Sequence, residues 1–256
     1  MTVMLGVKLL ASPIVVLVLF ACASNETAAT AGGGSSTASG GSATSSGGAS
    51  NVVPCNGEAT SSGEATYYDF ADGSGACSFD ATPNDLMVGA MNAPDYGNSE
   101  PCGACARIVG PNGTITVRVV DLCPECPKGN IDLSPVAFEK IAPLAQGRVP
   151  ITWQYVPCNV TGPVTFHFKD GSNQWWTAVQ LRNHRHAIAK FEYQNGSSFV
   201  DVPRVDYNYF VAASGMGPGP YTFRVTDVHG AVITDSGIPI GDNANRTGTQ
   251  QFPACN

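Results

Sequence analysis

The stretch VVDLCPECPKGNIDLSPVAF, residues 119–138, combines a strand, a turn and a helix start in one short segment. It continues the apolar run Thr116–Val120, which is expected to be a strand, and then turns through Cys-Pro-Glu-Cys-Pro. The Ser-Pro pair at 134–135 is typical of a helix N-terminus. Asp121 and Asp132 bracket the turn at the ends of elements, where site residues tend to lie. Three interpretations compete: a polysaccharide site, a metal-binding knuckle and helix capping.

The composition of the 256-residue chain favours loop-rich β structure. Charged residues make up only 13%, while Gly and Pro number 29 and 18. The formal net charge is −7 and no Lys/Arg cluster appears, so nucleic acid is not expected as a partner. The length is sufficient for two domains.

Residues 1–22 have the features of an export signal. Lys8 supplies a weak basic region, and the apolar run Leu9–Phe20 is too short for a comfortable membrane span. Leu19–Cys22 is similar to the lipobox of bacterial lipoproteins, which predicts lipidation of Cys22. An ordinary signal peptide with an incidental cysteine is the alternative. We expect an exported protein, either extracellular or held at the cell surface as a lipoprotein.

A run of Ser, Gly, Ala and Thr follows the signal over residues 23–51. Such a run cannot bury enough apolar surface to become ordered. By random-coil scaling it would be a flexible tether of roughly 30 Å. We therefore expect folded structure to begin near Asn51, with one domain over 52–158 and a second over 159–256.

Cysteine usage predicts a disulfide framework. Eight of the nine cysteines follow Cys22, and an even number in an exported chain is typical of disulfide pairing. Eight cysteines allow 105 pairings, so the sequence does not fix the connectivity. The Cys-x-x-Cys pairs at 102–105 and 123–126 also have the spacing of a four-thiolate zinc site. Export normally oxidises such thiols, which favours disulfides over zinc, and a redox Cys-x-x-Cys is a further alternative.

Short strands separated by turn signals dominate both predicted domains. In the first domain many strands with one short helix predict a small barrel, and in the second about seven strands predict a β-sandwich. The first set comprises Glu64–Tyr68, Asp85–Ala93 (ending in a turn of helix), Cys105–Val109, Thr114–Val120 and Val149–Val156, with the helix at 136–141. The second set comprises Val164–Phe168, Trp175–Leu181, Ile188–Tyr193, Phe199–Val202, Tyr207–Ala212, Tyr221–Asp227 and Ala231–Thr234.

Asp121 and Asp132 are the candidate carboxylates. Two carboxylates in one cleft are the minimum apparatus for glycoside hydrolysis, and partial burial raises the pKa of one so that it can hold a proton. The alternative is that Asp132 caps the helix together with Ser134, while Asp121 only ends a strand.

Trp175 and Trp176 are candidates for a sugar-stacking platform. Neighbours on a strand point to opposite faces, so only one of them would normally be buried. On a loop or sheet edge both would be exposed, and Tyr207 would extend the row. The alternative is one core tryptophan beside one exposed by chance.

The chain from Gly63 onward resembles a bacterial expansin. These are two-domain wall-loosening proteins with a double-ψ β-barrel and an immunoglobulin-like cellulose-binding sandwich. The resemblance implies an all-β fold whose barrel has six strands. It rests on GEATY (63–67), VDL (120–122), IDLSP (131–135) with AF (137–138), GSNQWW (171–176), VQLRNH (179–184) and DYN (206–208).

The resemblance implies a groove in the barrel lined by Thr66, Asp121 and Asp132. Asp132 stands at the position of the essential aspartate, which corresponds to the proton donor of related endoglucanases. Tyr67, in the same segment as Thr66, is expected to contact substrate. One position departs from the family pattern: Cys123 stands where members often have Tyr. Asp69 is a further carboxylate near the groove, and its presence leaves weak hydrolysis open.

A flat aromatic surface on the second domain is also implied. Trp175, Trp176 and Tyr207 would form it, with Lys169 beside them. The implied partners are cellulose and other β-1,4-linked wall polysaccharides, with peptidoglycan as a further candidate, and the membrane would be reached only through a lipid anchor. We expect a monomer with no cofactor and no metal.

The implied activity is non-hydrolytic loosening of contacts between polysaccharide chains, because the barrel of this family lacks the second catalytic carboxylate. A weak endoglucanase or peptidoglycan-lytic enzyme is one alternative, and a pure carbohydrate-binding surface protein is another. The resemblance also implies disulfide pairings: Cys77 with Cys102, Cys105 with Cys158, Cys123 with Cys126 and Cys55 with Cys255.

Overall fold

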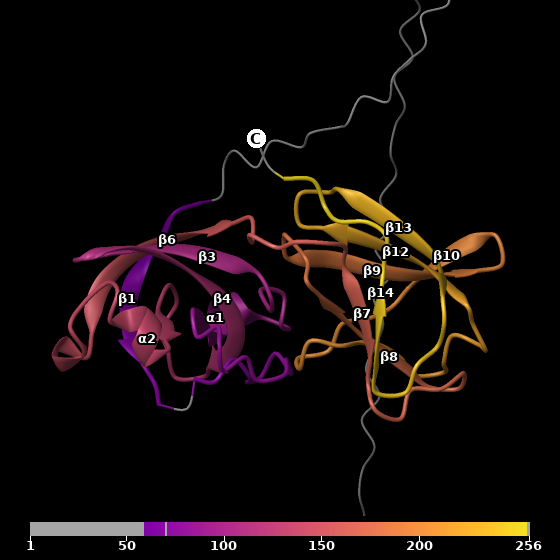
Figure 1. Cartoon of the computed structure of the whole chain (residues 1–256), viewed down its shortest axis with the longest axis horizontal. Coiled ribbons are helices and arrows are strands. Elements are labelled where there is room, and N and C mark those ends of the chain that lie inside the picture. Colours follow the sequence, from indigo (N-terminus) through magenta and orange to yellow (C-terminus); the bar gives the residue numbers. More distant parts are fainter. Residues whose placement is uncertain (1–58, 70, 255–256) are drawn as a thin grey trace, which may run out of the picture. The chain divides into compact units, whose positions relative to one another are not determined.

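A computed structural model of the chain describes residues 59–69 and 71–254, and it has the predicted all-β architecture. Figure 1 shows strands β1–β6 gathered in one half and strands β7–β14 in the other. The predicted signal, Cys22, the tether, Cys55 and Cys255 lie outside the described residues. Among the described residues, no helix has the length and apolar character needed to cross a membrane.

Six strands of the first half close into a barrel in the order β1-β5-β2-β4-β3-β6. The pairs β1/β5 and β2/β4 are parallel, and the other pairs are antiparallel. Closure leaves no exposed strand edge, which removes a route to aggregation. The strands are β1 (Ser61–Tyr67), β2 (Val88–Asn92), β3 (Cys105–Gly110), β4 (Gly113–Cys123), β5 (Ile131–Leu133) and β6 (Val149–Val156). The short helices are α1 (Ala93–Tyr96), α2 (Pro135–Phe138) and η1 (Leu144–Gln146).

The barrel core follows from the alternation along its strands. On β4, Ile115, Val117 and Val119 are buried, while the residues between them face outward or lie partly exposed. Helix α2 covers one end of the barrel with the fully buried Phe138. This helix is a single turn, shorter than the predicted 136–141. Its N-cap is Ser134, whose Oγ accepts a hydrogen bond from the Ala137 N–H at 3.0 Å.

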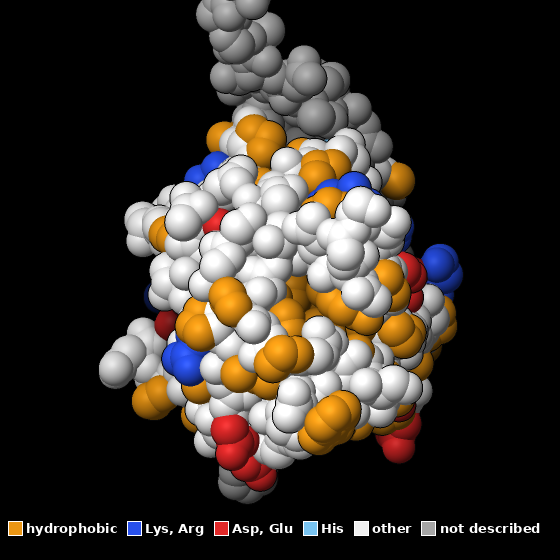
Figure 2. Space-filling view, turned by 90° about the vertical axis from the view of Figure 1, so that its right-hand side faces the viewer, with side chains coloured by type: hydrophobic (Ala, Val, Ile, Leu, Met, Phe, Trp, Pro, Cys, Tyr) orange, Lys and Arg blue, Asp and Glu red, His pale blue; other side chains and the backbone are white. Residues whose placement is uncertain are grey.

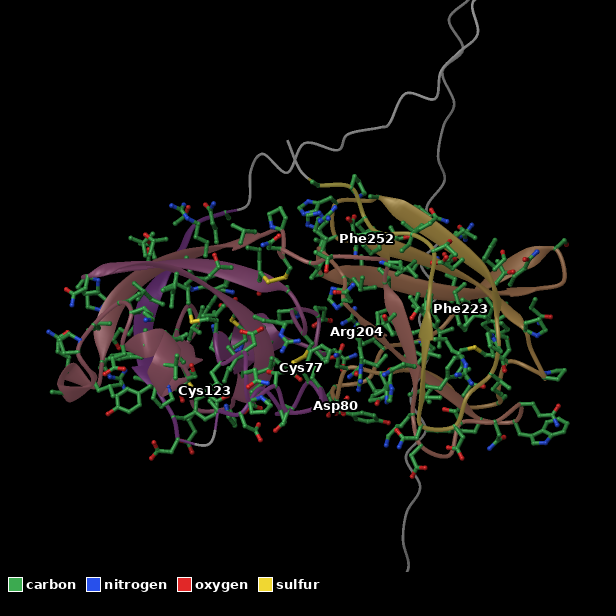
Figure 3. All side chains as sticks on the ribbon, viewed as in Figure 1. Cys77, Asp80, Cys123, Arg204, Phe223 and Phe252 are labelled. Atoms are coloured by element: carbon green, nitrogen blue, oxygen red, sulfur yellow. A yellow bond between two sulfur atoms is a disulfide. The ribbon has the colours of Figure 1, made fainter. Side chains whose placement is uncertain are left out.

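The second half consists of two four-stranded sheets, ordered β10-β9-β12-β13 and β11-β8-β7-β14. Their facing sides bury a cluster of phenylalanines. The rings of Phe166 and Phe191 lie 5.1 and 4.9 Å from that of Phe223, and Phe252 is also fully buried (Figure 3). The strands are β7 (Thr165–Phe168), β8 (Thr177–Arg182), β9 (Ile188–Asn195), β10 (Ser198–Asp201), β11 (Phe210–Ala212), β12 (Tyr221–Asp227), β13 (Val232–Ile238) and β14 (Ala244–Thr247).

Three disulfides link the described cysteines in the pairings that the family resemblance implies. Cys77 pairs with Cys102, Cys105 with Cys158 and Cys123 with Cys126. The four sulfurs of the zinc alternative are therefore distributed over three separate bonds. Within the described residues, no group of three or more His, Cys, Asp and Glu side chains is arranged to hold a metal.

Polar contacts join the barrel to the sheets at Cys77. Its carbonyl accepts hydrogen bonds from Gln180 Nε2 at 2.9 Å and from Asn208 Nδ2 at 3.1 Å. The guanidinium of Arg204 donates to the Ser99 carbonyl at 2.9 Å, and Figure 3 shows Cys77 and Arg204 where the two halves meet. Because Gln180 and Asn208 are themselves buried, these bonds satisfy groups that water does not reach.

Gly103 packs directly on the buried ring of His184. Its φ is +78°, and a Cβ added to it would lie 2.6 Å from His184 Nε2. Gly162 offers a matched comparison, because its φ is +77° and nothing lies within 4 Å of an added Cβ. Both positions therefore strain an L-residue, but only Gly103 would also clash.

Gly103→Ala is expected to lower the free energy of unfolding more than Gly162→Ala does. Positive φ alone costs about 1 kcal/mol, and overpacking against His184 adds about 1–3 kcal/mol. Urea unfolding of the two variants measures the difference. Equal losses in both variants would show that the contact between Gly103 and His184 is not tight.

Candidate functional site

Thr66, Asp132, Ala90 and Asp121 lie in one row across four adjacent barrel strands. Thr66 pairs with Asp132, Asp132 with Ala90, and Ala90 with Asp121. Paired residues on neighbouring strands point to the same face of a sheet, so the two predicted carboxylates share a face with Thr66. Two strand spacings separate Asp121 from Asp132, about 10 Å between their Cα atoms. The small side chain of Ala90 leaves room between them.

Asp132 is a half-buried carboxyl group held by Thr66. The Thr66 hydroxyl donates a hydrogen bond to Asp132 Oδ1. Burial raises the pKa of Asp132 above its ordinary value, with a smaller rise from the charge of Asp121, and the Thr66 bond and Arg148 oppose this only in part. Ser134 rather than Asp132 caps helix α2, so the capping interpretation of Asp132 is wrong. The site thus contains a carboxyl group that keeps its proton to higher pH than an exposed aspartate does.

Asp121 is held by backbone donors. Its Oδ1 accepts hydrogen bonds from the N–H groups of Ala76 at 2.7 Å and Leu122 at 2.8 Å. The neighbouring Gly75 approaches so closely that an added Cβ would lie 2.4 Å from Asp121 Cγ. A side chain at position 75 would therefore displace the carboxylate.

Two tyrosines at the end of β1 complete the groove. The ring of Tyr67 lies 5.0 Å from that of Phe138 and remains partly exposed. Burial raises the pKa of Tyr68, and the charges of Asp121 and Asp132 raise it further, so this phenol stays protonated beside both carboxylates. Tyr67 is among the site residues predicted from the sequence, whereas Tyr68 is not. Asp69 is exposed in the turn that follows.

The loop beside Asp132 is braced by covalent and ionic contacts. The disulfide Cys123–Cys126 closes its start. The carboxylate of Asp95 accepts hydrogen bonds from Lys128 Nζ at 2.6 Å and from the Gly129 N–H at 3.0 Å. Cys123, where family members often have Tyr, therefore lies in a loop held by a disulfide and by the contacts of Asp95.

Trp175 and Trp176 lie in the turn before β8. Their backbone N–H groups both donate to Asn173 Oδ1, at 2.9 and 3.2 Å. This side-chain turn explains why Trp175 is not in a strand, although a strand was predicted from residue 175. Trp175 is 73% exposed and Trp176 is partly exposed, so neither is a core residue.

The outward face of the sheet β11-β8-β7-β14 carries further candidate residues. Phe168 and Phe210 point into the core, so their neighbours Lys169 and Tyr209 point outward. Lys169 Nζ lies 5.7 Å from the Tyr209 ring centroid, and the rings of Tyr207 and Tyr209 are 5.8 Å apart. Tyr209 itself is buried, with only 5% of its surface exposed, so we define the aromatic face as Lys169, Trp175, Trp176 and Tyr207.

Tyr209, whose ring contacts that of Tyr207, was not predicted from the sequence. Its position two residues after Tyr207 was the available signal.

Figure 2 views the end of the molecule formed by the two four-stranded sheets, where apolar side chains lie among uncharged polar ones and charged groups are few.

These features define the class of protein. A closed six-stranded double-ψ barrel with two carboxylates on one face precedes a pair of sheets with exposed aromatic side chains. The protein therefore belongs to the class in which a barrel is followed by a β-sandwich, and its exposed aromatic side chains form a surface suited to sugar polymers.

Comparisons with known proteins identify the family. The sequence model of a family described as lytic transglycolase matches residues 60–153. Expansin-YoaJ of Bacillus subtilis is 38% identical over 161 residues, which is 61% of this chain and 69% of that protein. The crystal structure of apo Clavibacter michiganensis expansin superimposes with a TM-score of 0.72 at 32% identity, covering 77% of this chain and all of that one. A mutant of that expansin, solved with cellohexaose, gives the same TM-score at 31% identity and the same coverage. The chain belongs to the expansin family.

Asp132→Asn is expected to raise stability at neutral pH. The folded-state pKa of Asp132 lies above the ordinary 3.8, so ionisation destabilises the fold as pH rises through this window. Asn stays neutral and can still accept the Thr66 hydroxyl. The gain is at most about 1.4 kcal/mol for each unit by which the pKa is raised, reduced by solvent screening because the carboxyl group is only half buried, and it should disappear below about pH 3.

Thermal unfolding at pH 7 and pH 3 measures this difference. Asp170→Asn, at an exposed position, serves as the control and should change stability little at either pH. A variant Asp132→Asn less stable than wild type at pH 7 would contradict the expected cost of the charge.

Proposed function

We propose that this protein binds β-1,4-glucan and loosens the non-covalent contacts between wall polysaccharide chains. The observation that carries the proposal is the row from Thr66 to Asp121, which aligns hydroxyl and carboxyl groups on one face of the barrel. The cellohexaose complex of the Clavibacter michiganensis relative supports a glucan as the ligand.

The two surfaces would grip a chain by different forces. The hydroxyl of Thr66 and the carboxyl groups of Asp121 and Asp132 hydrogen-bond to sugar hydroxyls in directions that fix the chain. The exposed ring of Trp175 and its neighbours on the aromatic face stack against the apolar faces of sugar rings. A loosening protein needs only to hold one chain more tightly than the neighbouring chains do.

The segment Gly75–Asp80 supports cooperation between the two surfaces. At its start the Ala76 N–H binds Asp121, and at its end Asp80 pairs with Arg182 of β8 at 2.6 Å. Between them the Cys77 carbonyl receives Asn208, the residue next to Tyr207. A glucan bound along both surfaces would therefore pass over a short, tightly bonded segment.

The proposed action is non-hydrolytic. Glycoside hydrolysis needs a second carboxylate free to act as base or nucleophile near the acid. Asp121 has one oxygen engaged by two backbone N–H groups, which suits a fixed acceptor better than a mobile base. Asp132 then acts by holding a sugar hydroxyl, with its carboxyl group positioned by the Thr66 hydroxyl.

A lytic activity is the second candidate. The raised pKa of Asp132 favours it, because a carboxyl group that keeps its proton to higher pH is better suited to protonate a leaving oxygen. The family model described as lytic transglycolase covers the barrel that contains Asp132. A pure binding module is the third candidate and would leave Asp132 without a role.

We further propose that the protein is exported and acts as a monomer outside the cytoplasm. The oxidised cysteines support this location. Lipidation at Cys22 and a tether over residues 23–51 would hold the folded part at the cell surface.

Asp132→Ala should abolish creep of a wall strip while leaving cellulose binding largely intact. The double variant Trp175→Ala with Trp176→Ala should lose most cellulose binding, since stacking contributes about 1–3 kcal/mol for each ring by analogy with base stacking. Creep, pull-down on cellulose and release of reducing sugar are measured on each variant.

Phe199→Ala, which removes an aromatic ring on the other sheet under Arg224, is the control for the aromatic face. Sugar release that disappears in Asp132→Ala would reject the non-hydrolytic proposal in favour of the lytic one. Unchanged creep in Asp132→Ala would show that loosening does not need Asp132, and of the three candidate functions only the pure binding module would remain.

A further inference from the structure

A cleft of about 610 Å³ lies between the barrel and the start of the sheets. Its walls are the loop 79–87, strand β4, the linker 158–161 and the end of β8. The volume is typical of small-ligand sites. None of its lining residues belongs to the Thr66–Asp121 row or to the aromatic face, so the cleft is separate from the proposed glucan surface.

Arg118 is the central charged group of this cleft. Its side chain leaves β4 on the outer side, because the neighbouring Val117 and Val119 point into the barrel core. The guanidinium lies 5.5 Å from the Phe79 ring centroid, and Nη2 donates to Thr82 Oγ1 at 3.3 Å. Arg118 Nε is buried and has no hydrogen-bond partner among the described residues.

This cation lacks a direct counter-charge. The ion pairs within the described residues do not include Arg118. Burial lowers its pKa, and only the charge of Asp85 acts in the opposite direction. A largely desolvated guanidinium without a paired anion is costly, so a bound anion would stabilise it. The planar fork of Arg matches a carboxylate in particular.

The remaining walls suit the ring of a sugar. Thr82, Thr116 and Asn159 present hydroxyl and amide groups, and the partly exposed Met87 offers an apolar contact. The second guanidinium, that of Arg182, is already paired with Asp80 (labelled in Figure 3) and does not compete for the anion. The cleft therefore contains two guanidinium groups, of which only that of Arg118 has no ion pair, together with the carboxylates of Asp80 and Asp85 and neutral polar groups.

We infer that the Arg118 cleft binds a hexuronate, a sugar residue whose carboxylate is held by the guanidinium of Arg118. The chain carries a net charge of −7, which disfavours a densely charged polyanion. A single uronate attached to an otherwise neutral polysaccharide avoids that repulsion. The cleft would then hold an acidic branch while the glucan surface holds a neutral chain.

Titration of the ¹⁵N-labelled protein with methyl β-D-glucuronoside tests the inference. The expected result is a saturable shift of the Arg118 Nε–H and Gly103 N–H signals. The neutral methyl β-D-glucoside differs only at C6 and should bind at least about tenfold more weakly, because it lacks the charge-assisted pair. Equal binding of the two glycosides would overturn the inference.

Variants separate binding from folding. Thr116→Trp places a large ring in the cleft beside Arg118, on the same face of β4, without removing the guanidinium, and should abolish glucuronoside binding; Thr114→Trp, exposed on the same strand outside the cleft, should leave it unchanged. Arg118→Lys keeps the charge but loses the fork and should weaken binding about tenfold. Both Trp variants should still bind cellulose, which tests the glucan proposal independently.

Two outcomes would reject the site as assigned. Glucuronoside binding that persists in Thr116→Trp would place the ligand elsewhere. Acetate alone producing the same shifts with the same affinity would show a bare carboxylate site with no contribution from the sugar ring.

Discussion

The fixed position of Cys77 is the constraint on which both surfaces depend. Its disulfide to Cys102 anchors it to the barrel, and its carbonyl receives Gln180 and Asn208 from the sheets. One residue earlier, the Ala76 N–H binds the carboxylate of Asp121. A shift of this segment would therefore move the groove and the aromatic face together, because the same backbone contacts both.

Strand register provides the second constraint. Asp132 reaches the groove because β5 pairs with β1 on one side and with β2 on the other. A slip of one residue would turn Asp132 to the opposite face of the sheet. Closure of the barrel and the buried neighbours Ile131 and Leu133 resist such a slip, since both would leave the core.

Burial also sets the hydrogen-bonding chemistry of the groove side chains. It raises the pKa of Asp132 and keeps the phenol of Tyr68 protonated as a potential donor near the acceptor Asp121. This mixture suits sugar hydroxyls, which both donate and accept. The same desolvation acts on Arg118, but there the charge has no way to neutralise at ordinary pH.

The sequence by itself determined the all-β class, the positions of most strands and the candidate pair Asp121 and Asp132, because alternation and family motifs are local patterns. The disulfide pairings were implied only by the family resemblance, since the number of cysteines does not fix their connectivity. The sequence did not predict β5, since three residues are too few to show an alternation, and it placed Trp175 in a strand rather than in the turn set by Asn173. Only the tertiary structure decided that Ala90 separates the two aspartates, that Tyr68 lies beside them and that Arg118 faces a cleft. These relations join residues distant in sequence, and strand pairing in three dimensions is the physical cause that brings them together.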